Sequence, residues 1–214
     1  EGSVTNPQTA YGKSKIMAEE DIMQLADDNF SPVYMRNATA FGSSPRMRFD
    51  IVVNNLTGYA NVDKEIKIMG DGKPWRPLVH IRDICQAIIT VLTADKKTIH
   101  NQVFNVGDNK ENYQIRDIAN KVKEYYSACK VTIAKKDAGD SRDYNVAFNK
   151  LNTFLGFSCT WSLKKGIIEL GKTYERINLN DQIFNHRLYT RLKQINYLLE
   201  KNKLDMNLRR INNG

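Results

Sequence analysis

The chain has 214 residues, of which 41% are hydrophobic and 26% charged, a composition that excludes an intrinsically disordered protein. Lys and Arg outnumber Asp and Glu by 32 to 24, and the resulting net charge of +8 suits a protein that binds an anionic ligand. No apolar run approaches the roughly 20 residues that a membrane-spanning helix needs, so we expect no membrane partner.

The three cysteines and three histidines indicate neither disulfides nor a metal site. The cysteines are odd in number, far apart and without a Cys-x-x-Cys pair, which is typical of reduced thiols in a cytoplasmic protein. The histidines lack the spacing of metal ligands, so no protein-bound metal is expected. The first residue is Glu1 rather than Met, and we therefore expect the chain to begin within a longer protein.

Helices and short apolar strands alternate in the first half of the chain. Helical spacing of apolar residues predicts a helix over 10–28, and the run over 32–42 predicts one buried strand that ends at a glycine. A second helix is predicted over 49–62. Two strand-like runs around a Gly-Asp-Gly turn are expected over 66–81.

The same alternation continues in the second half. The pattern predicts, in order, a helix over 82–94, a strand over 102–107, a helix over 113–127, a strand over 130–134, a polar loop over 137–150, a helix over 163–177 and helical spacing over 181–214. Such alternation favours the α/β class with a parallel sheet.

Tyr11 and Lys15 stand four residues apart near the start of the first predicted helix, and side chains with this spacing share one helix face. An ammonium group stabilises a phenolate beside it, so such a tyrosine can exchange a proton with a sugar or alcohol hydroxyl. The spare donors of the lysine can hold a cofactor ribose. Tyr-x-x-x-Lys also occurs in helices without a catalytic role, so the pair alone leaves an ordinary polar helix face open.

The context of this pair resembles the extended short-chain dehydrogenase/reductase family, the NAD-dependent sugar-nucleotide epimerases and dehydratases. The segment PQTAYGKSKIMAEE is similar to the active-site helix of that family. Further similar segments follow in the family's order: VYMRNATAFGSSPR, GDGKPWRPLVHIRDICQAI, FNVG and DSRDYNVAFNKLNTFLGFSCTWSLKKGI. The resemblance covers roughly residues 1–175. It implies the C-terminal part of a Rossmann-type parallel sheet with a smaller α/β substrate-binding lobe and a C-terminal helical tail.

The resemblance also implies two domain segments and a set of cofactor contacts. Residues 1–180 would form a partial epimerase/dehydratase domain, and residues 181–214 a helical extension. Tyr11 would be the catalytic acid/base. Lys15 would support it and bind the nicotinamide ribose, and Asn37 would join them at the cofactor, NAD or NADP.

Substrate contacts are carried over in the same way. Arg76 and Arg142 would clamp the diphosphate of a nucleotide-sugar substrate, a task that suits guanidinium groups because they stay charged and present forked donors. Asn55 matches an asparagine that contacts the diphosphate in some relatives, with Asn54 as the competing choice. Thr39 stands where most relatives carry asparagine, and its shorter side chain leaves that substrate contact open.

The cofactor half of the family pattern is not found in the sequence. No Gly-x-x-Gly-x-x-Gly follows a strand, so the backbone amides that hold the NAD pyrophosphate are lacking. The family's catalytic Ser or Thr lies further upstream of the tyrosine than the ten residues that precede Tyr11. We therefore expect the chain alone to be inactive and marginally stable, with an unpaired strand at the edge of its sheet.

The implied activity is that of a sugar-nucleotide epimerase, which oxidises a nucleotide-linked sugar transiently and then returns the hydride. A dehydratase or reductase of the same family stays open. The resemblance also implies a homodimer of the full-length protein through the helix that carries Tyr11. The alternative from another class is a basic module that binds nucleotides, RNA or a partner. Single-strand binding needs aromatic residues alternating with basic ones, and this pattern is weak here, with only Tyr189, Tyr197 and scattered arginines. No nucleic-acid partner is therefore expected.

Overall fold

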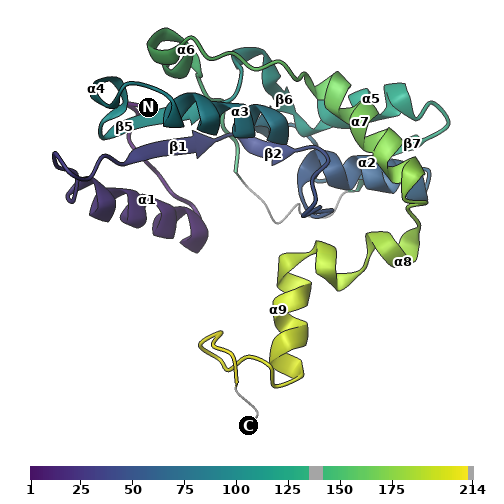
Figure 1. Ribbon diagram of the computed structural model, residues 1–214. Helices are drawn as coiled ribbons and strands as arrows, with labels where there is room; N and C mark the ends of the chain where they lie inside the picture. Colours follow the sequence, from purple (N-terminus) through teal and green to yellow (C-terminus); the bar gives the residue numbers. More distant parts are fainter. Residues whose placement is uncertain (135–141, 212–214) are drawn as a thin grey trace.

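The computed structural model describes residues 1–134 and 142–211 and shows a mixed α/β protein (Figure 1). The elements are, in order, α1 (Ala10–Met23), β1 (Val33–Asn37), β2 (Thr39–Phe41), α2 (Val52–Val62), β3 (Glu65–Met69), β4 (Trp75–His80), α3 (Ile81–Leu92), α4 (Lys96–Ile99), β5 (Gln102–Val106), η1 (Asn109–Glu111), β6 (Asn112–Gln114), α5 (Ile115–Tyr125), β7 (Lys130–Ala134), α6 (Asn149–Leu155), α7 (Leu163–Arg176), α8 (Asp181–Phe184), η2 (Arg187–Tyr189) and α9 (Arg191–Glu200). The α/β class predicted from the sequence is confirmed. Among the described residues, no helix is long and apolar enough to cross a membrane.

The first layer is a parallel pair of strands, β1 and β5, in register from Val33 with Gln102 to Asn37 with Val106. Helix α1 lies on one side of this pair, and α3 and α6 lie on the other (Figure 1). The side with α3 and α6 holds a core in which Phe104 and Val106 are fully buried. This arrangement leaves α1 covered on one side only, and no residue of α1 is buried.

The run over 32–42 forms two strands rather than the single strand that its composition predicts. The backbone N–H of Ala38 donates to the carbonyl of Val106, and from Thr39 onward the chain pairs with β4 instead. Strand β2 therefore leaves the first pair and lies parallel to β4. Strand β4 in turn pairs antiparallel with β6. The expected sheet is therefore parallel only in part, and β6 occupies the first residues of the helix predicted over 113–127.

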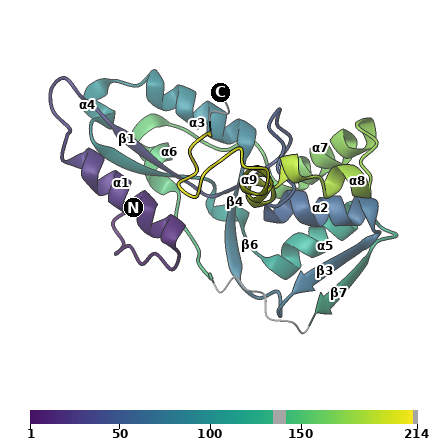
Figure 2. The same ribbon diagram turned by 90° about the horizontal axis from the view of Figure 1, so that it is seen from below.

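The second layer is a lobe in which β3 pairs in parallel with β7. The two runs around the Gly-Asp-Gly turn do not pair with each other, because β3 belongs to this lobe and β4 to the sheet of β2 and β6. Helices α2, α5 and α7 pack together beside the strands, as Figure 2 shows for α2 and α5. Their apolar faces share one core, with Val53, Ile118 and Leu170 fully buried.

The C-terminal segment extends away from the lobe (Figure 1). Its first part is anchored: Phe184 of α8 is buried against Phe49 and Tyr59, with ring centroids 5.3 and 5.0 Å apart. Helix α9 has no buried residue, and Leu192 on it is 68% exposed. The segment expected as an extension therefore begins inside the lobe core and ends as an exposed helix.

Candidate active site

The first turn of α1 is fixed by local hydrogen bonds that present Tyr11. The Thr9 hydroxyl caps the helix by accepting a hydrogen bond from the Gly12 N–H at 3.1 Å, as N-cap threonines do. The Ser14 hydroxyl donates to the carbonyl of Tyr11 at 2.8 Å. These bonds place Tyr11 at the second helical position, where its side chain is 71% exposed.

Tyr11 and Lys15 lie together on this turn, as the i, i+4 spacing predicts. The Lys15 ammonium nitrogen is 5.5 Å from the centroid of the Tyr11 ring. At this distance the cation interacts favourably with the electron-rich ring face. The pair is open to a ligand, because neither residue is buried.

A cavity of about 530 Å³ lies beside Lys15, and residues from distant parts of the chain line it together with α1. Lys15 and Gly12 line it from α1, Arg36 from β1, and Tyr144 from the segment before α6. Arg36 is held by a two-pronged ion pair with Glu19 of α1, at 3.0 and 2.6 Å, and the hydrogen bonds to this carboxylate raise the pKa of Arg36. The ion pair ties β1 to α1 at the base of the cavity.

The two arginines expected at the diphosphate lie next to each other, although 66 residues separate them. Arg76 is buried at the start of β4, and its Nη1 donates to the carbonyls of Trp75, at 2.8 Å, and of Arg142. The guanidinium of Arg76 also lies 5.7 Å from the ring centroid of Tyr144. Through Tyr144, the arginine region adjoins the cavity beside Lys15.

The two neighbouring asparagines of α2 differ in their surroundings. Asn54 is buried and makes hydrogen bonds with both backbone groups of Gly42 and with the carbonyl of Arg48. Asn55 is half-buried, and its Nδ2 donates to the carbonyl of Phe49 at 2.9 Å. Asn54 is therefore occupied in shaping the loop before α2, and Asn55 is the more accessible of the two.

Asn37 and Thr39 flank the point where the chain passes from one sheet to the next. Asn37 is the exposed last residue of β1, and Thr39 is the half-buried first residue of β2. Both therefore lie at the carboxyl end of β1, the edge at which ligands bind in open α/β sheets.

Arg48 is a further charged residue that the sequence analysis did not single out. It forms two hydrogen bonds of 2.8 Å with the carboxylate of Asp50, and these raise the pKa of Arg48, with a smaller electrostatic contribution from Tyr11 in its ionised form. The same contacts lower the pKa of Asp50. Since 37 positions separate Arg48 from Tyr11, only its place in an arginine-rich loop after β2 could have indicated it.

His80, at the end of β4, lies in the protein interior. Its ring is fully buried, stacks on Trp161 at 4.1 Å and contacts Glu169 through Nε2 at 2.8 Å. Burial lowers the pKa of His80, against the effect of the Glu169 carboxylate. A side chain at Gly42, whose φ is +110°, would place its Cβ 2.3 Å from the His80 ring. His80 thus organises packing around the loop after β2.

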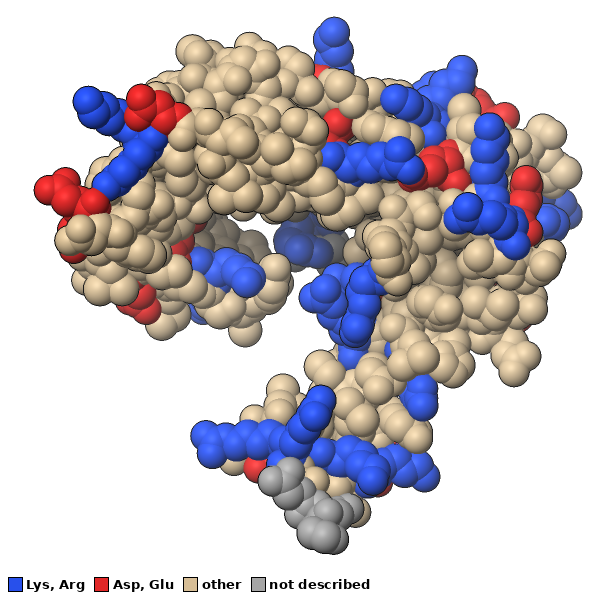
Figure 3. Space-filling model, viewed as in Figure 1, with Lys and Arg blue, Asp and Glu red and all other residues tan. Residues whose placement is uncertain are grey.

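The space-filling view shows a deep hollow between the α1 side of the molecule and the opposite half (Figure 3). Lys and Arg atoms lie on both of its sides and within it. A hollow lined by positive charge attracts anionic ligands and favours those with phosphate groups.

A family model described as the NAD dependent epimerase/dehydratase family matches residues 1–107, which is half of the chain. The chain belongs to this family. The match includes α1 with Tyr11 and Lys15, and the strands β1, β2 and β4 that surround the candidate site.

Solved structures of epimerase/dehydratase proteins share the fold of the chain. UDP-glucuronic acid 4-epimerase from Bacillus cereus, in complex with UDP-glucuronic acid and NAD, is similar at 25% identity and a TM-score of 0.70, over 83% of this chain and 57% of its own. dTDP-glucose 4,6-dehydratase from Bacillus anthracis, in complex with NAD, is similar at 19% identity and a TM-score of 0.71, over 82% and 55%. ADP-L-glycero-D-manno-heptose-6-epimerase from Helicobacter pylori follows at 22% identity and a TM-score of 0.69, over 81% and 54%. The chain thus spans little more than half the length of these relatives.

Proposed function

We propose that the chain carries the catalytic helix and the substrate-binding half of a sugar-nucleotide epimerase. The observation that carries this proposal is the exposed Tyr11 with the Lys15 ammonium 5.5 Å from its ring, on a helix where Lys15 also lines a cavity. Membership of the NAD-dependent epimerase/dehydratase family supports it.

In this proposal, Tyr11 exchanges a proton with a hydroxyl of the sugar. Its phenolic oxygen takes the proton when the carbon that bears the hydroxyl is oxidised, and it gives the proton back when the carbonyl group is reduced. Tyr11 is a phenolate before it takes the proton and again after it gives the proton back, and the Lys15 ammonium stabilises that phenolate. Epimerisation results when the carbonyl carbon is presented with its opposite face before reduction.

The substrate in this proposal is a nucleotide-linked sugar held by its diphosphate. Arg76 and Arg142 lie side by side, and the Arg76–Tyr144 contact brings them next to the cavity that Lys15 lines. Asn55 and Thr39 would contribute further hydrogen bonds to the substrate.

The described residues fit one end of NAD. Tyr11 and Lys15 are exposed side by side and can hold the nicotinamide ribose, with Asn37 at the adjacent strand end. When bound, NAD supplies the acceptor and later the donor of the hydride. The glycine-rich turn that would hold the pyrophosphate is not in the 214-residue sequence, so we expect this chain to need a second segment for tight NAD binding.

The alternative activity is that of a dehydratase or reductase of the same family, and product analysis in the assay below distinguishes it from epimerisation.

We propose that the full-length protein forms a homodimer through α1, because apolar side chains of this helix are exposed. Met17 is 61% and Ile22 38% exposed on this helix, although both are apolar. Apolar surface of this kind is typical of positions that a partner covers.

The proposal is tested with the chain joined upstream of Glu1 to a Rossmann half that carries the glycine-rich turn, assayed for epimerisation of UDP-sugars. Tyr11→Phe removes the proton-transferring oxygen, so kcat is expected to fall about 10²–10⁴-fold, with a much smaller change in substrate affinity. Tyr59→Phe, on α2, is the matched control and should retain activity. An unchanged kcat in Tyr11→Phe would exclude Tyr11 as the acid/base.

A further inference from the structure

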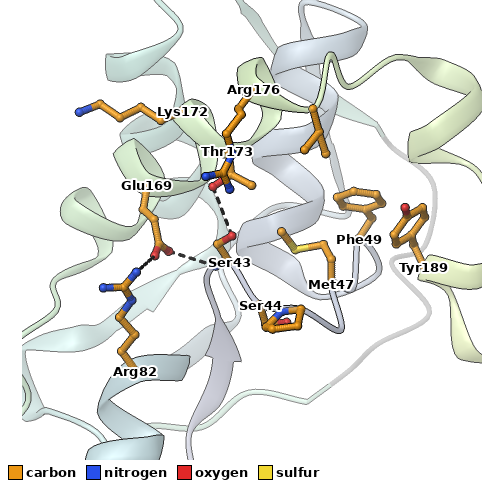
Figure 4. Close-up of a pocket in the computed structure, with 12 residues that line it drawn as sticks. Ser43, Ser44, Met47, Phe49, Arg82, Glu169, Lys172, Thr173, Arg176 and Tyr189 are labelled. Carbon is orange, nitrogen blue, oxygen red and sulfur yellow. Dashed lines mark hydrogen bonds and ion pairs between the residues drawn. The ribbon is translucent and has the colours of Figure 1, made fainter.

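A second cavity, of about 680 Å³, lies apart from the candidate active site. It is formed by the loop after β2, the start of α3, the second half of α7 and η2 (Figure 4). The residues proposed for catalysis, cofactor or substrate binding do not line it. Its volume lies in the range of about 300–1,000 Å³ that is usual for sites of small organic ligands.

The cavity has an apolar wall and a polar wall. Met47, Phe49 and Tyr189 form the apolar wall. Ile177 is a further apolar residue in the lining. On the other side, the Ser43 hydroxyl and the Thr173 hydroxyl are hydrogen-bonded to each other at 3.2 Å. Arg176 also lines the cavity, three residues after Thr173 on α7, a spacing that places two side chains on the same helix face. Lys172 points away from the two hydroxyls in Figure 4. Donors and a positive charge thus face an apolar surface across one cavity.

The only carboxylate that lines the cavity is already engaged. Glu169 accepts hydrogen bonds from the Ser43 N–H at 3.0 Å and contacts His80 Nε2 at 2.8 Å, and its other oxygen lies 3.3 Å from Nη2 of Arg82. Among the described residues, no carboxylate forms an ion pair with Arg176 or Lys172. With three basic residues and one acidic residue in its lining, the cavity carries an excess of positive charge.

The position of Arg176 in the last turn of α7 explains part of this charge, because a cation at a helix C-terminus interacts favourably with the helix dipole. The helix dipole does not explain why three other elements converge on this cavity. Nor does it explain why the hydroxyls of Ser43 and Thr173 face the apolar wall across the same space. A cationic group beside two hydroxyls is an arrangement that binds phosphate, sulfonate or carboxylate oxygens.

We propose that this cavity is a binding site for a small organic phosphate, with the phosphate at Arg176, Ser43 and Thr173 and an apolar or aromatic group against Met47 and Tyr189. The loop that forms its apolar wall, between β2 and α2, also carries the ion pair of Arg48 with Asp50.

The test measures direct binding to the 214-residue chain and needs neither NAD nor catalysis, so its result is independent of the proposed function. The probe is 1-naphthyl phosphate, followed by its fluorescence, with inorganic phosphate and 1-naphthol as its two separate parts. We expect 1-naphthyl phosphate to bind at least about tenfold more tightly than either part, because the site engages both groups.

Two substitutions and one matched control locate the binding. Arg176→Gln and Ile177→Asp are each expected to weaken the binding of 1-naphthyl phosphate about tenfold. The first removes the cation, and the second places a negative charge in the apolar part of the lining. Arg116→Gln, an equal charge change at an exposed position of α5 outside the cavity, should leave binding unchanged. Equal affinity in all four proteins, or an equal loss in Arg116→Gln and Arg176→Gln, would overturn the proposal. Circular dichroism spectra confirm that each variant is folded.

Discussion

Asn54 and Asn55 are adjacent, chemically identical side chains that the fold uses in different ways. The buried Asn54 amide serves as both donor and acceptor for the backbone of the loop before α2. Asn55 donates one hydrogen bond to Phe49 and is half-buried. The difference predicts that one position controls stability and that the other is available for substrate.

Asn54→Ala is expected to lower the free energy of unfolding by at least about 1–3 kcal/mol, because it leaves the buried polar groups of Gly42 unpaired. Asn55→Ala should cost less stability, and in the active joined protein it should raise KM for the UDP-sugar. Urea denaturation measures the first effect and steady-state kinetics the second. A larger loss of stability in Asn55→Ala than in Asn54→Ala would contradict this assignment.

His80 is expected to make stability depend on pH. Burial lowers its pKa in the folded protein below the ordinary value of 6.5, so the unfolded chain takes up a proton more readily. Its contribution to the unfolding free energy is therefore complete above pH 6.5 and is lost as the pH falls below that value. We expect the free energy of unfolding, measured by urea denaturation between pH 7.5 and 5.5, to change less with pH in His80→Gln than in the unmodified chain. An NMR titration of the His80 ring provides a check that needs no variant, and a midpoint above 6.5 would contradict the prediction.

At the scale of elements, the start of the C-terminal segment is part of the lobe. Helix α2 has a glycine, Gly58, where the Phe184 ring packs, and a Cβ there would lie 2.2 Å from the Phe184 Cε2. The glycine therefore allows α8 to approach α2, and Phe184 and Leu179 join the lobe core from opposite sides of residue 180. A domain boundary placed near 180 would divide a packed cluster.

Phe184→Ala is expected to lower the free energy of unfolding by about 3–5 kcal/mol, the usual effect of removing a buried phenylalanine ring. Leu192→Ala, on the exposed α9, should change it by less than about 0.5 kcal/mol. Thermal or urea unfolding of the two variants measures both effects. Similar small losses in both would show that α8 contributes no more to the core than α9 does.

The sequence predicted elements better than it predicted their partners. The apolar run over 32–42 was correctly expected to be extended, but its division at Ala38 depends on the distant strands β4 and β5, which local composition does not report. Likewise, the turn between β3 and β4 resembles a hairpin, whereas each strand pairs with a segment far along the chain. The spacing of Tyr11 and Lys15 is a local property and was sufficient to place them together. The electrostatic interaction of Arg48 with Tyr11 arises only from the tertiary fold.

At the scale of the whole molecule, both edges of the first sheet stay open in the described part of the chain. Strands β1 and β5 pair only with each other there, so each has one edge without a partner strand. Unpaired strand edges promote association between chains. Together with the absence of the glycine-rich turn from the sequence, the free edge of β1 is the expected attachment site for a Rossmann segment that completes both the sheet and the cofactor site.

The central claim is that these 214 residues hold the catalytic pair and the substrate half of the enzyme but depend on another segment for NAD. The most direct measurement is a fluorescence titration of NADH with the chain alone and with the chain joined to a Rossmann half that carries the glycine-rich turn. We predict that only the joined protein binds NADH at micromolar concentrations. Micromolar binding by the 214-residue chain alone would contradict the account, and the pyrophosphate would then have to be held by residues assigned here to structure.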